Sequence, residues 1–296
     1  MAGLLTSSFE LPNNISAVIF KKAQTGSTIA RLSAAEPQKF GKETTWVLTG
    51  APKAELVGEG AQKSPTPTTY APKTITPLKL QVTMRFSQEV KWADEDAQIG
   101  VLKDMGENGG IALGRALDLV GFHKINPLTG TVSSLVPNGL ADSTLSATLA
   151  GGKYDNLVEA GAGAVIGAGY TPSGIAMDPV LSFGLATQKN VNGDKLFPGI
   201  GFGQNMTEFM GMSAAVSDTV SGKNELAVAG DIIGIIGQWD AIRWGVQRSI
   251  MAHMIEYGDP DGLGDLQRMN QIALRLEIVY GLGILANDAF AKLLKQ

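Results

Sequence analysis

The longest regular pattern of apolar residues in the chain runs from Trp92 to His123. Within it, apolar side chains recur three or four positions apart, at Ile99, Leu102, Met105, Leu113, Leu117 and Val120. This spacing places them on one face of an α-helix. Asp94 is suited to cap the start of the helix and Gly121 to end it. About 28 residues at a rise of 1.5 Å predict a helix of roughly 42 Å, which is longer than most helices of globular proteins.

Four glycines interrupt the middle of this predicted helix. They are Gly106, Gly109, Gly110 and Gly114. Each costs a helix interior roughly 0.5–1 kcal/mol relative to alanine. Packing must therefore hold the helix, either because another backbone approaches these glycines closely or because the helix bends or breaks near Gly106 to Gly110. We predict a long helix that lies across a sheet.

Alternation of apolar and polar residues predicts strands on both sides of this helix. It is strict over Leu78–Phe86 and again over Ile272–Tyr280, and shorter over Ile242–Val246. Thr44–Thr49 is rich in β-branched and aromatic residues and suits a further strand. We expect these segments to assemble one sheet from distant parts of the chain.

Short elements fill the middle of the chain and predict a second lobe. Lys153–Val165 has the composition of a helix, and Ser173–Leu185 that of a strand followed by a helical turn. Ile232–Ile236 is a short apolar segment after a Gly-Asp pair. A long helix on a sheet, with a second lobe from the middle of the chain, predicts an α+β fold.

Two segments lack apolar partners of their own. Residues 1–14 contain Leu4, Leu5, Phe9 and Leu11 without periodicity, which indicates a frayed terminus or an arm that orders only on a neighbouring subunit. Residues 50–73 carry four prolines and little to bury. A connection of this length is unusual inside a compact domain. We therefore expect a long hairpin that projects from the body and finds its partner on another subunit.

Composition narrows the classes of function. The chain has 296 residues, 44% of them hydrophobic, a net charge of −4 and no cysteine. The absence of cysteine excludes disulfides, thiolate metal sites and cysteine nucleophiles. No block of Lys and Arg stands out, which argues against sequence-specific nucleic-acid binding and leaves loose enclosure of nucleic acid open. No apolar run approaches the roughly 18 residues that span a membrane, and no secretory signal is present, so no membrane partner is expected.

The motifs that invite a catalytic or metal-binding interpretation are weak. The stretch GAGAVIGAG (161–169) follows helical sequence, whereas a dinucleotide fingerprint follows a strand and has a different glycine spacing. A helix end and turn is the simpler interpretation. The two histidines, His123 and His253, leave few options for a triad or a zinc site. The acidic loop 257–265 lacks the spacing of a calcium site and suits a solvated loop. We expect neither a cofactor nor a metal.

The order of these features resembles that of tailed-bacteriophage major capsid proteins of the Hong Kong 97 fold. The stretches that carry the resemblance are VGEGAQKSP (57–65), FSQEVKWADED (86–96), the helix to Gly121, AVAGDIIG (227–234) and NQIALRLEIVYGLGILANDAF (270–290). Each stretch is weak alone. Their order over nearly the whole chain is the specific signal.

The resemblance implies an α+β Hong Kong 97-type capsid fold that is divided along the chain. The implied parts are an N-terminal arm with a first peripheral segment (1–36), an extended loop hairpin (37–86), a spine helix with a peripheral segment (87–149), an axial domain (150–240) and the closing strands of the peripheral domain (241–296). Some family members carry a charged helical scaffold segment before the arm. This chain starts at the arm, which implies a separate scaffold protein or none.

The function that the resemblance implies is that of a shell subunit. Copies of the chain would form the pentamers and hexamers of an icosahedral phage head around double-stranded DNA, without sequence specificity. A portal protein is a further implied partner, and the subunit would assemble in the host cytoplasm and reside in the virion capsid. Two alternatives remain: an encapsulin-like compartment shell that encloses enzymes, and a small-molecule enzyme that uses the Gly-rich turn.

The resemblance also implies a covalent crosslink. Some capsids of the family join subunits by an isopeptide bond between a Lys of the extended loop and an Asn of the peripheral domain, assisted by a Glu. Lys63 matches that lysine, and Asn270 and Glu277 match the other two by their spacing. A lysine amine must lose a proton before it attacks, and Glu277 would be the base if desolvation raised its pKa.

Spacing separates two of these residues within one chain. Asn270 and Glu277 are an odd number of positions apart, so on one regular strand they face opposite ways at roughly 23 Å, and a shared site needs different subunits. The simpler interpretation leaves Lys63 on an exposed loop, Asn270 capping a strand and Glu277 paired with Arg275 or solvated. Lys53 and Lys73 are rival lysines of the same loop.

Overall fold

The computed structural model describes residues 21–23, 26–48, 52–66, 68–92, 95–202, 206–228 and 230–295. The expected arm over residues 1–14 and the expected helix cap Asp94 lie outside the described residues. No helix in the described part of the chain is long and apolar enough to cross a membrane.

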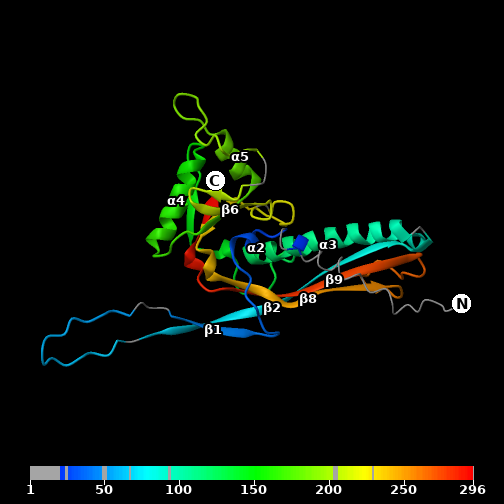
Figure 1. Cartoon of the computed structure of the whole chain (residues 1–296), viewed down its shortest axis with the longest axis horizontal. Helices are drawn as coiled ribbons and strands as arrows, with labels where there is room; N and C mark the ends of the chain where they lie inside the picture. The colour runs from blue at the N-terminus through cyan, green and yellow to red at the C-terminus, as the bar shows by residue number, and fades with distance from the viewer. Residues whose placement is uncertain are drawn as a thin grey trace.

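A long helix on a four-stranded antiparallel sheet forms what we name the body (Figure 1). The helix is α3, Glu95–His123. The sheet has the order β1-β2-β9-β8. Its strands are β1 (Glu43–Leu48), β2 (Tyr70–Ser87), β8 (Ile242–Ile255) and β9 (Gln271–Ile284). The long helix and the alternating strands predicted from the sequence are therefore confirmed.

The glycines of α3 allow close packing. The helix is continuous, so the predicted alternative of a break near Gly106 to Gly110 is wrong. A Cβ atom added at Gly114 would lie 2.1 Å from the carbonyl oxygen of Ala23, and one at Gly109 would lie 2.4 Å from Leu276 Cδ1. Neither position has room for a side chain. The glycines cost helix propensity and in return let a neighbouring backbone and the sheet approach the helix.

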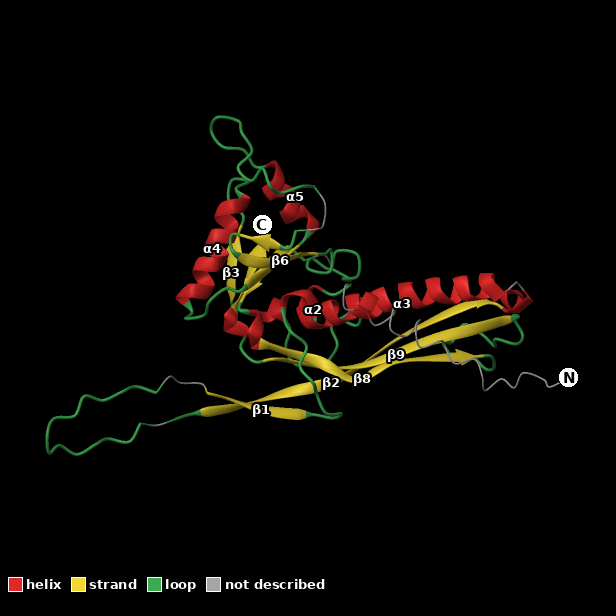
Figure 2. Cartoon of the chain, in the orientation of Figure 1, coloured by secondary structure: helices red, strands yellow, loops and turns green. Residues whose placement is uncertain are grey.

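The second lobe is a six-stranded mixed sheet with two helices beside it (Figure 2). The strand order is β3-β10-β7-β4-β6-β5. The strands are β3 (Leu145–Thr148), β4 (Gly174–Met177), β5 (Glu208–Phe209), β6 (Met212–Val216), β7 (Ile232–Gly237) and β10 (Phe290–Leu294), and the helices are α4 (Tyr154–Gly167) and α5 (Pro179–Thr187). The helix predicted from Lys153 and the strand and turn predicted from Ser173 are confirmed.

The last strand, β10, is absent from the predictions. Its five residues, FAKLL, are too few to display an alternation. β10 pairs with β3 and β7, so the end of the chain returns to the second lobe. The six-stranded sheet therefore takes strands from outside residues 150–240, the range expected for the axial domain.

One apolar core continues from the body into the second lobe. Leu113 and Leu117 of α3 pack with Leu276 and its neighbours on β9. Trp239, fully buried, extends this cluster because its ring meets those of Phe122 and Phe290 edge-on at centroid distances of 6.5 and 5.6 Å. The described part of the chain also contains four short 3₁₀ helices and α2: Gln88–Trp92, Leu140–Asp142, Trp239–Ala241, Asn287–Ala289, and α2 at Thr28–Leu32.

The predicted hairpin projects from the body (Figures 1 and 2). β1 pairs with the first part of β2, from Glu43 opposite Ile75 to Leu48 opposite Tyr70. Beyond these strands, loop 52–66 is held by few contacts, among them two bonds that Ser64 donates to the Glu55 carboxylate at 2.9 and 3.0 Å. We name residues 43–75 the extended hairpin.

Candidate functional site

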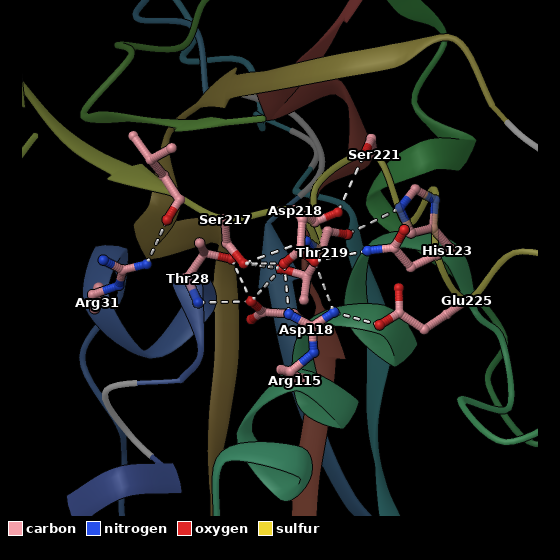
Figure 3. Close-up of polar contacts among 12 residues, drawn as sticks. Thr28, Arg31, Arg115, Asp118, His123, Ser217, Asp218, Thr219, Ser221 and Glu225 are labelled. Atoms are coloured by element: carbon pink, nitrogen blue, oxygen red, sulfur yellow. Dashed lines mark hydrogen bonds and ion pairs between the residues drawn. The ribbon is translucent and has the colours of Figure 1, made fainter. Parts of the chain in front are cut away.

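A buried carboxylate connects α2, α3 and the loop that follows β6. Asp118 of α3 is fully buried, and its oxygens accept five hydrogen bonds (Figure 3). The donors are Ser27 Oγ at 2.6 Å, Thr28 N at 2.7 Å, Thr28 Oγ1 at 2.6 Å, Ile29 N at 3.1 Å and Thr219 Oγ1 at 2.8 Å. We name this cluster, with Arg115 and the loop 217–225, the polar junction.

The start of α2 explains why a carboxylate lies here. The first backbone N–H groups of a helix have no partner within the helix and carry partial positive charge. Asp118 accepts two of these groups, those of Thr28 and Ile29. Burial raises the pKa of Asp118, and the hydrogen bonds from Ser27 and Thr28 oppose that rise. The junction therefore uses a side chain of α3 to fix the start of α2.

Arg115, one turn before Asp118 on α3, binds the same loop by charge. Its guanidinium donates to Asp218 at 2.5 and 3.1 Å and also to Glu225. These bonds raise the pKa of Arg115, and the hydrogen bond that it donates to Asp218 has the largest effect. Burial acts to raise the pKa of Asp218, but the bonds from Arg115 outweigh it and lower the pKa. Asp218 is therefore held as a carboxylate, and its ion pair with Arg115 ties the loop 217–225 to α3.

His123 ends α3 at the same junction. Its Nε2 lies 3.3 Å from the carbonyl oxygen of Thr219 and 3.0 Å from that of Val220, so this nitrogen carries the hydrogen and donates. Burial lowers the pKa of His123. The junction as a whole joins the second lobe to the body.

The polar junction is not among the features predicted from the sequence. The signal available was one acidic residue, Asp118, inside the apolar run ALDLVGF. Acidic residues are rarely fully buried unless they are paired or hydrogen-bonded. The partners of Asp118 could not be read from the sequence because Ser27, Thr28 and Thr219 are distant along the chain.

The structure keeps the three predicted crosslinking residues apart within one subunit. Lys63 is exposed on loop 52–66, at the far end of the extended hairpin. Asn270 directly precedes β9, and Glu277 lies within it. That loop and the start of β9 are at opposite ends of the molecule's long axis (Figure 1).

Glu277 is paired with Lys79, not with the predicted partner Arg275. The distance from Lys79 Nζ to Glu277 Oε2 is 2.9 Å. The hydrogen bond from Lys79 lowers the pKa of Glu277, which makes its carboxylate a weaker base in the free subunit. Arg275 instead donates to Thr83 Oγ1 at 3.1 Å and to the carbonyl of Pro260 at 2.7 Å.

Asn270 occupies a turn that suits its residue type. Its φ of +53° lies in the left-handed region, which asparagine tolerates better than most residues. Its carbonyl accepts a hydrogen bond from Gln88 N at 2.8 Å, just before β9 begins. Asn270 is exposed.

The acidic loop 257–265 is an ion-paired turn. Arg85 of β2 donates to Asp259 at 3.1 Å, to the Gly264 carbonyl at 2.9 Å, and to Asp261. The hydrogen bond from Arg85 lowers the pKa of Asp261 to about 2. Among the described residues, no group of three His, Cys, Asp or Glu side chains is arranged to hold a metal ion.

Solved structures resemble the chain over its whole length. A chain of Mycobacterium phage Ogopogo is 47% identical, with 100% of both chains covered and a TM-score of 0.83. A chain of Gordonia phage Cozz is 32% identical over 91% of this chain and 86% of that one, with a TM-score of 0.77. The chain belongs to the tailed-bacteriophage major capsid proteins of the Hong Kong 97 fold. No family model and no curated protein matches it.

A more distant comparison extends the fold of this capsid protein beyond these two phages. The capsid of the empty GTA particle is 12% identical over 91% of this chain and 90% of that one, with a TM-score of 0.64. The role rests on the two phage chains of higher identity: this protein is a structural shell subunit of the virion capsid. None of these matches favours the encapsulin-like alternative.

The Gly-rich stretch of this capsid protein does not have the geometry of a nucleotide site. Residues 161–167 lie inside α4, and the turn comes only at Gly169, with φ +89°. A Cβ atom at Gly161 would lie 2.4 Å from Leu293 Cδ2, so this glycine lets α4 pack against β10. A dinucleotide fingerprint requires its glycines between a strand and the start of a helix.

Proposed function

We propose that this major capsid protein assembles into the pentamers and hexamers of an icosahedral head, with each extended hairpin lying on a neighbouring subunit. The observation that carries the proposal is the exposed apolar surface of the hairpin. Trp46 and Tyr70 are 66% and 55% exposed, and Leu56 is fully exposed. Exposed apolar side chains gathered on a projecting ribbon favour burial by a partner. The division into arm, extended loop, spine, axial and peripheral parts belongs to this proposal.

The enclosed cargo in this proposal is double-stranded DNA. The net charge of −4 and the lack of a basic cluster suit enclosure rather than sequence-specific binding. A portal protein and a separate scaffold protein are further proposed partners, and assembly takes place in the host cytoplasm. These partners follow from the family and not from any contact described above.

A shortened hairpin tests the assembly proposal. Replacing residues 49–69 by Asn-Gly joins Leu48 to Tyr70, which already face each other, by a two-residue hairpin turn. We expect electron microscopy of the purified protein to show shells for the natural chain and folded, unassembled subunits for the variant. Closed shells from the shortened variant would contradict the proposal. Particles from infected cells should protect DNA from nuclease, whereas enclosed protein without DNA would favour the compartment alternative.

We also propose an isopeptide crosslink between subunits. Lys63 Nζ of one subunit attacks the side-chain carbonyl carbon of Asn270 of another, forming a C–N bond. The bond from that carbon to the amide nitrogen breaks, and the nitrogen leaves as ammonia. Glu277 accepts the proton of Lys63 and returns it to the leaving nitrogen. This step needs the Lys79–Glu277 pair to open, because that pair lowers the pKa of Glu277.

Denaturing electrophoresis of mature particles tests the crosslink. We expect a ladder of covalent multimers that is lost in Lys63→Arg and in Asn270→Ala particles. The control variants Lys53→Arg and Lys73→Arg should keep the ladder. Lys79→Met should speed its appearance, because Glu277 loses the cation that lowers its pKa. A single band near 31.0 kDa from natural particles would end this proposal.

A further inference from the structure

The connection between α2 and β1 passes the edge strand β8 and then lies on the face of the sheet opposite α3. We name this segment, Ser33–Lys42, the strap; it is the blue trace that runs from α2 past β8 to β1 (Figure 1). Its place follows from two glycines of the sheet. Gly245 and Gly281 come directly after Trp244 and Tyr280, which pack in the core with α3. Because successive strand residues face opposite sides, a side chain at either glycine would point away from α3.

The strap lies directly against these two glycines, because neither has a side chain that would keep it away from the sheet. A Cβ atom at Gly245 would lie 2.0 Å from the carbonyl oxygen of Glu36, and one at Gly281 would lie 1.7 Å from Gln38 Oε1. Glycine inside a strand often marks such a close approach. A side chain at Gly245 would collide with the backbone of the strap, whereas one at Gly281 would displace the side-chain ends of Gln38 and Gln247.

The first half of the strap is held along the edge strand β8. Glu36 N donates to the carbonyl of Trp244 at 2.9 Å, and Trp244 Nε1 donates to the carbonyl of Ser33 at 3.3 Å. Arg243 Nε lies 3.3 Å from Glu36 Oε2. The start of the strap is thus held to β8 by a backbone hydrogen bond, a hydrogen bond from the Trp244 indole and an ion pair.

Among the described residues, the hydrogen bonds that hold the second half of the strap come from the side chain of Gln247. Its Nε2 donates to the carbonyl of Gly41 at 2.9 Å, and its Oε1 accepts from Gly41 N at 3.2 Å. The register of β8 against β9 shifts between Val246 and Arg248, so Gln247 lies at a β-bulge. Bulges re-aim side chains. Gly41 has φ +118°, and β1 begins two residues later, at Glu43.

We propose that Gln247 is a positioning residue for assembly. Its side chain hydrogen-bonds both the N–H and the carbonyl of Gly41, and so fixes the direction in which the extended hairpin leaves the body. A hairpin already held in its binding direction loses less conformational freedom when it meets a neighbouring subunit. This inference rests on the proposed function, in which the hairpin lies on a neighbour.

We name the pair of hydrogen bonds between Gln247 and Gly41 the clamp. Variants at both of its residues test this role. Gln247→Leu keeps the volume and removes both hydrogen bonds. Gly41→Ala disturbs the same contact from the strap, because alanine rarely adopts this φ and no described atom lies within 4 Å to clash with its Cβ. Ser249→Ala, on the same strand and exposed, is the control.

The readouts separate positioning from folding. In unassembled subunits we expect both clamp variants to exchange the backbone amides of residues 41–48 faster, with α3 and β9 unchanged. Shell formation, followed by light scattering, should slow about tenfold, the effect of roughly 1.4 kcal/mol of lost pre-organisation. The Ser249→Ala protein should assemble at the natural rate.

Three outcomes would count against the clamp. If the shortened hairpin abolishes assembly while Gln247→Leu and Gly41→Ala assemble at the natural rate, the positioning role is overturned and the proposed function stands. If the shortened hairpin also assembles normally, the proposed function fails and the role of Gln247 fails with it. Slower exchange or unchanged exchange at residues 41–48 in both clamp variants would likewise overturn the positioning role.

Discussion

At the scale of single residues, one buried carboxylate connects three segments of the chain. Each oxygen of Asp118 accepts one backbone N–H: Ile29 N donates to Oδ1 and Thr28 N to Oδ2. An asparagine in this place has one oxygen and one NH₂ group. Whichever way its amide points, a buried backbone N–H faces another donor. The geometry therefore demands a group that accepts on both sides.

Asp118→Asn should accordingly destabilise the subunit. We expect a loss of about 2–4 kcal/mol in the free energy of unfolding, since hydrogen bonds to a charged group are lost and a buried N–H is left unpaired. Urea unfolding of the unassembled subunit measures it. Asp104→Asn, on the exposed side of the same helix, is the control and should change stability little. Equal stability of the two variants would show that the five bonds do not hold α2.

At the scale of elements, the same residue type has opposite uses along α3. Gly114 faces the carbonyl of Ala23, with no room for a Cβ atom, whereas no described atom lies within 4 Å of a Cβ at Gly100. Helix propensity favours alanine at both positions by about 1 kcal/mol. Tertiary contact reverses that preference at one of them.

The pair Gly100→Ala and Gly114→Ala should therefore shift stability in opposite directions. We expect Gly100→Ala to raise the free energy of unfolding by about 0.5–1 kcal/mol. Gly114→Ala should lower it by about 1–3 kcal/mol through overpacking. Thermal and urea unfolding of both variants in parallel measure the difference. A gain in stability at Gly114 would mean that the backbone of Ala23 is not held against the helix.

The loop 257–265 gives an element-scale prediction about pH. The Arg85–Asp261 bond lowers the pKa of Asp261 to about 2, from an ordinary value of 3.8. A lowered folded-state pKa contributes stability above pH 3.8 that disappears as pH falls toward 2. Asp261→Asn should be less stable than the natural chain at pH 6 and should lose less stability between pH 4 and 2. Parallel slopes for the two proteins in urea unfolding would contradict this.

At the scale of the whole molecule, the chain is a body, a second lobe and a projecting hairpin. The polar junction and the aromatic contacts of Trp239 hold the lobe to the body. Loop 52–66 has no comparable support among the described residues, and its contacts are local hydrogen bonds such as those from Ser64 to Glu55. The body and the second lobe are thus held together by many contacts, whereas the tip of the extended hairpin is held by few.

Limited proteolysis should detect this difference. Trypsin should cut unassembled subunits at Lys53 and Lys63, because both lie exposed on loop 52–66. Assembled shells should resist at the same sites if a neighbour covers the hairpin. Mass spectrometry of the fragments identifies the cut positions, and lysines on the body that are exposed in both states provide the internal control. Equal protection in both states would remove the support for a covered hairpin.

The sequence by itself determined the elements whose burial repeats along one stretch of chain. The period of Ile99–Val120 predicts α3, the alternation of Leu78–Phe86 and Ile272–Tyr280 predicts β2 and β9, and the proline-rich segment without apolar partners predicts the hairpin. These are local signals, because the period of a buried face is written into consecutive residues.

Only the tertiary structure decided which distant groups meet. Glu277 pairs with Lys79, not Arg275, because the register of β2 against β9 brings Lys79 beside it. The contacts of Asp118 with the start of α2 and of Gln247 with Gly41 also join distant segments, as does the pairing of β10 within the second lobe. Each of these contacts depends on how separate elements pack, and no pattern within one element records where its neighbour lies.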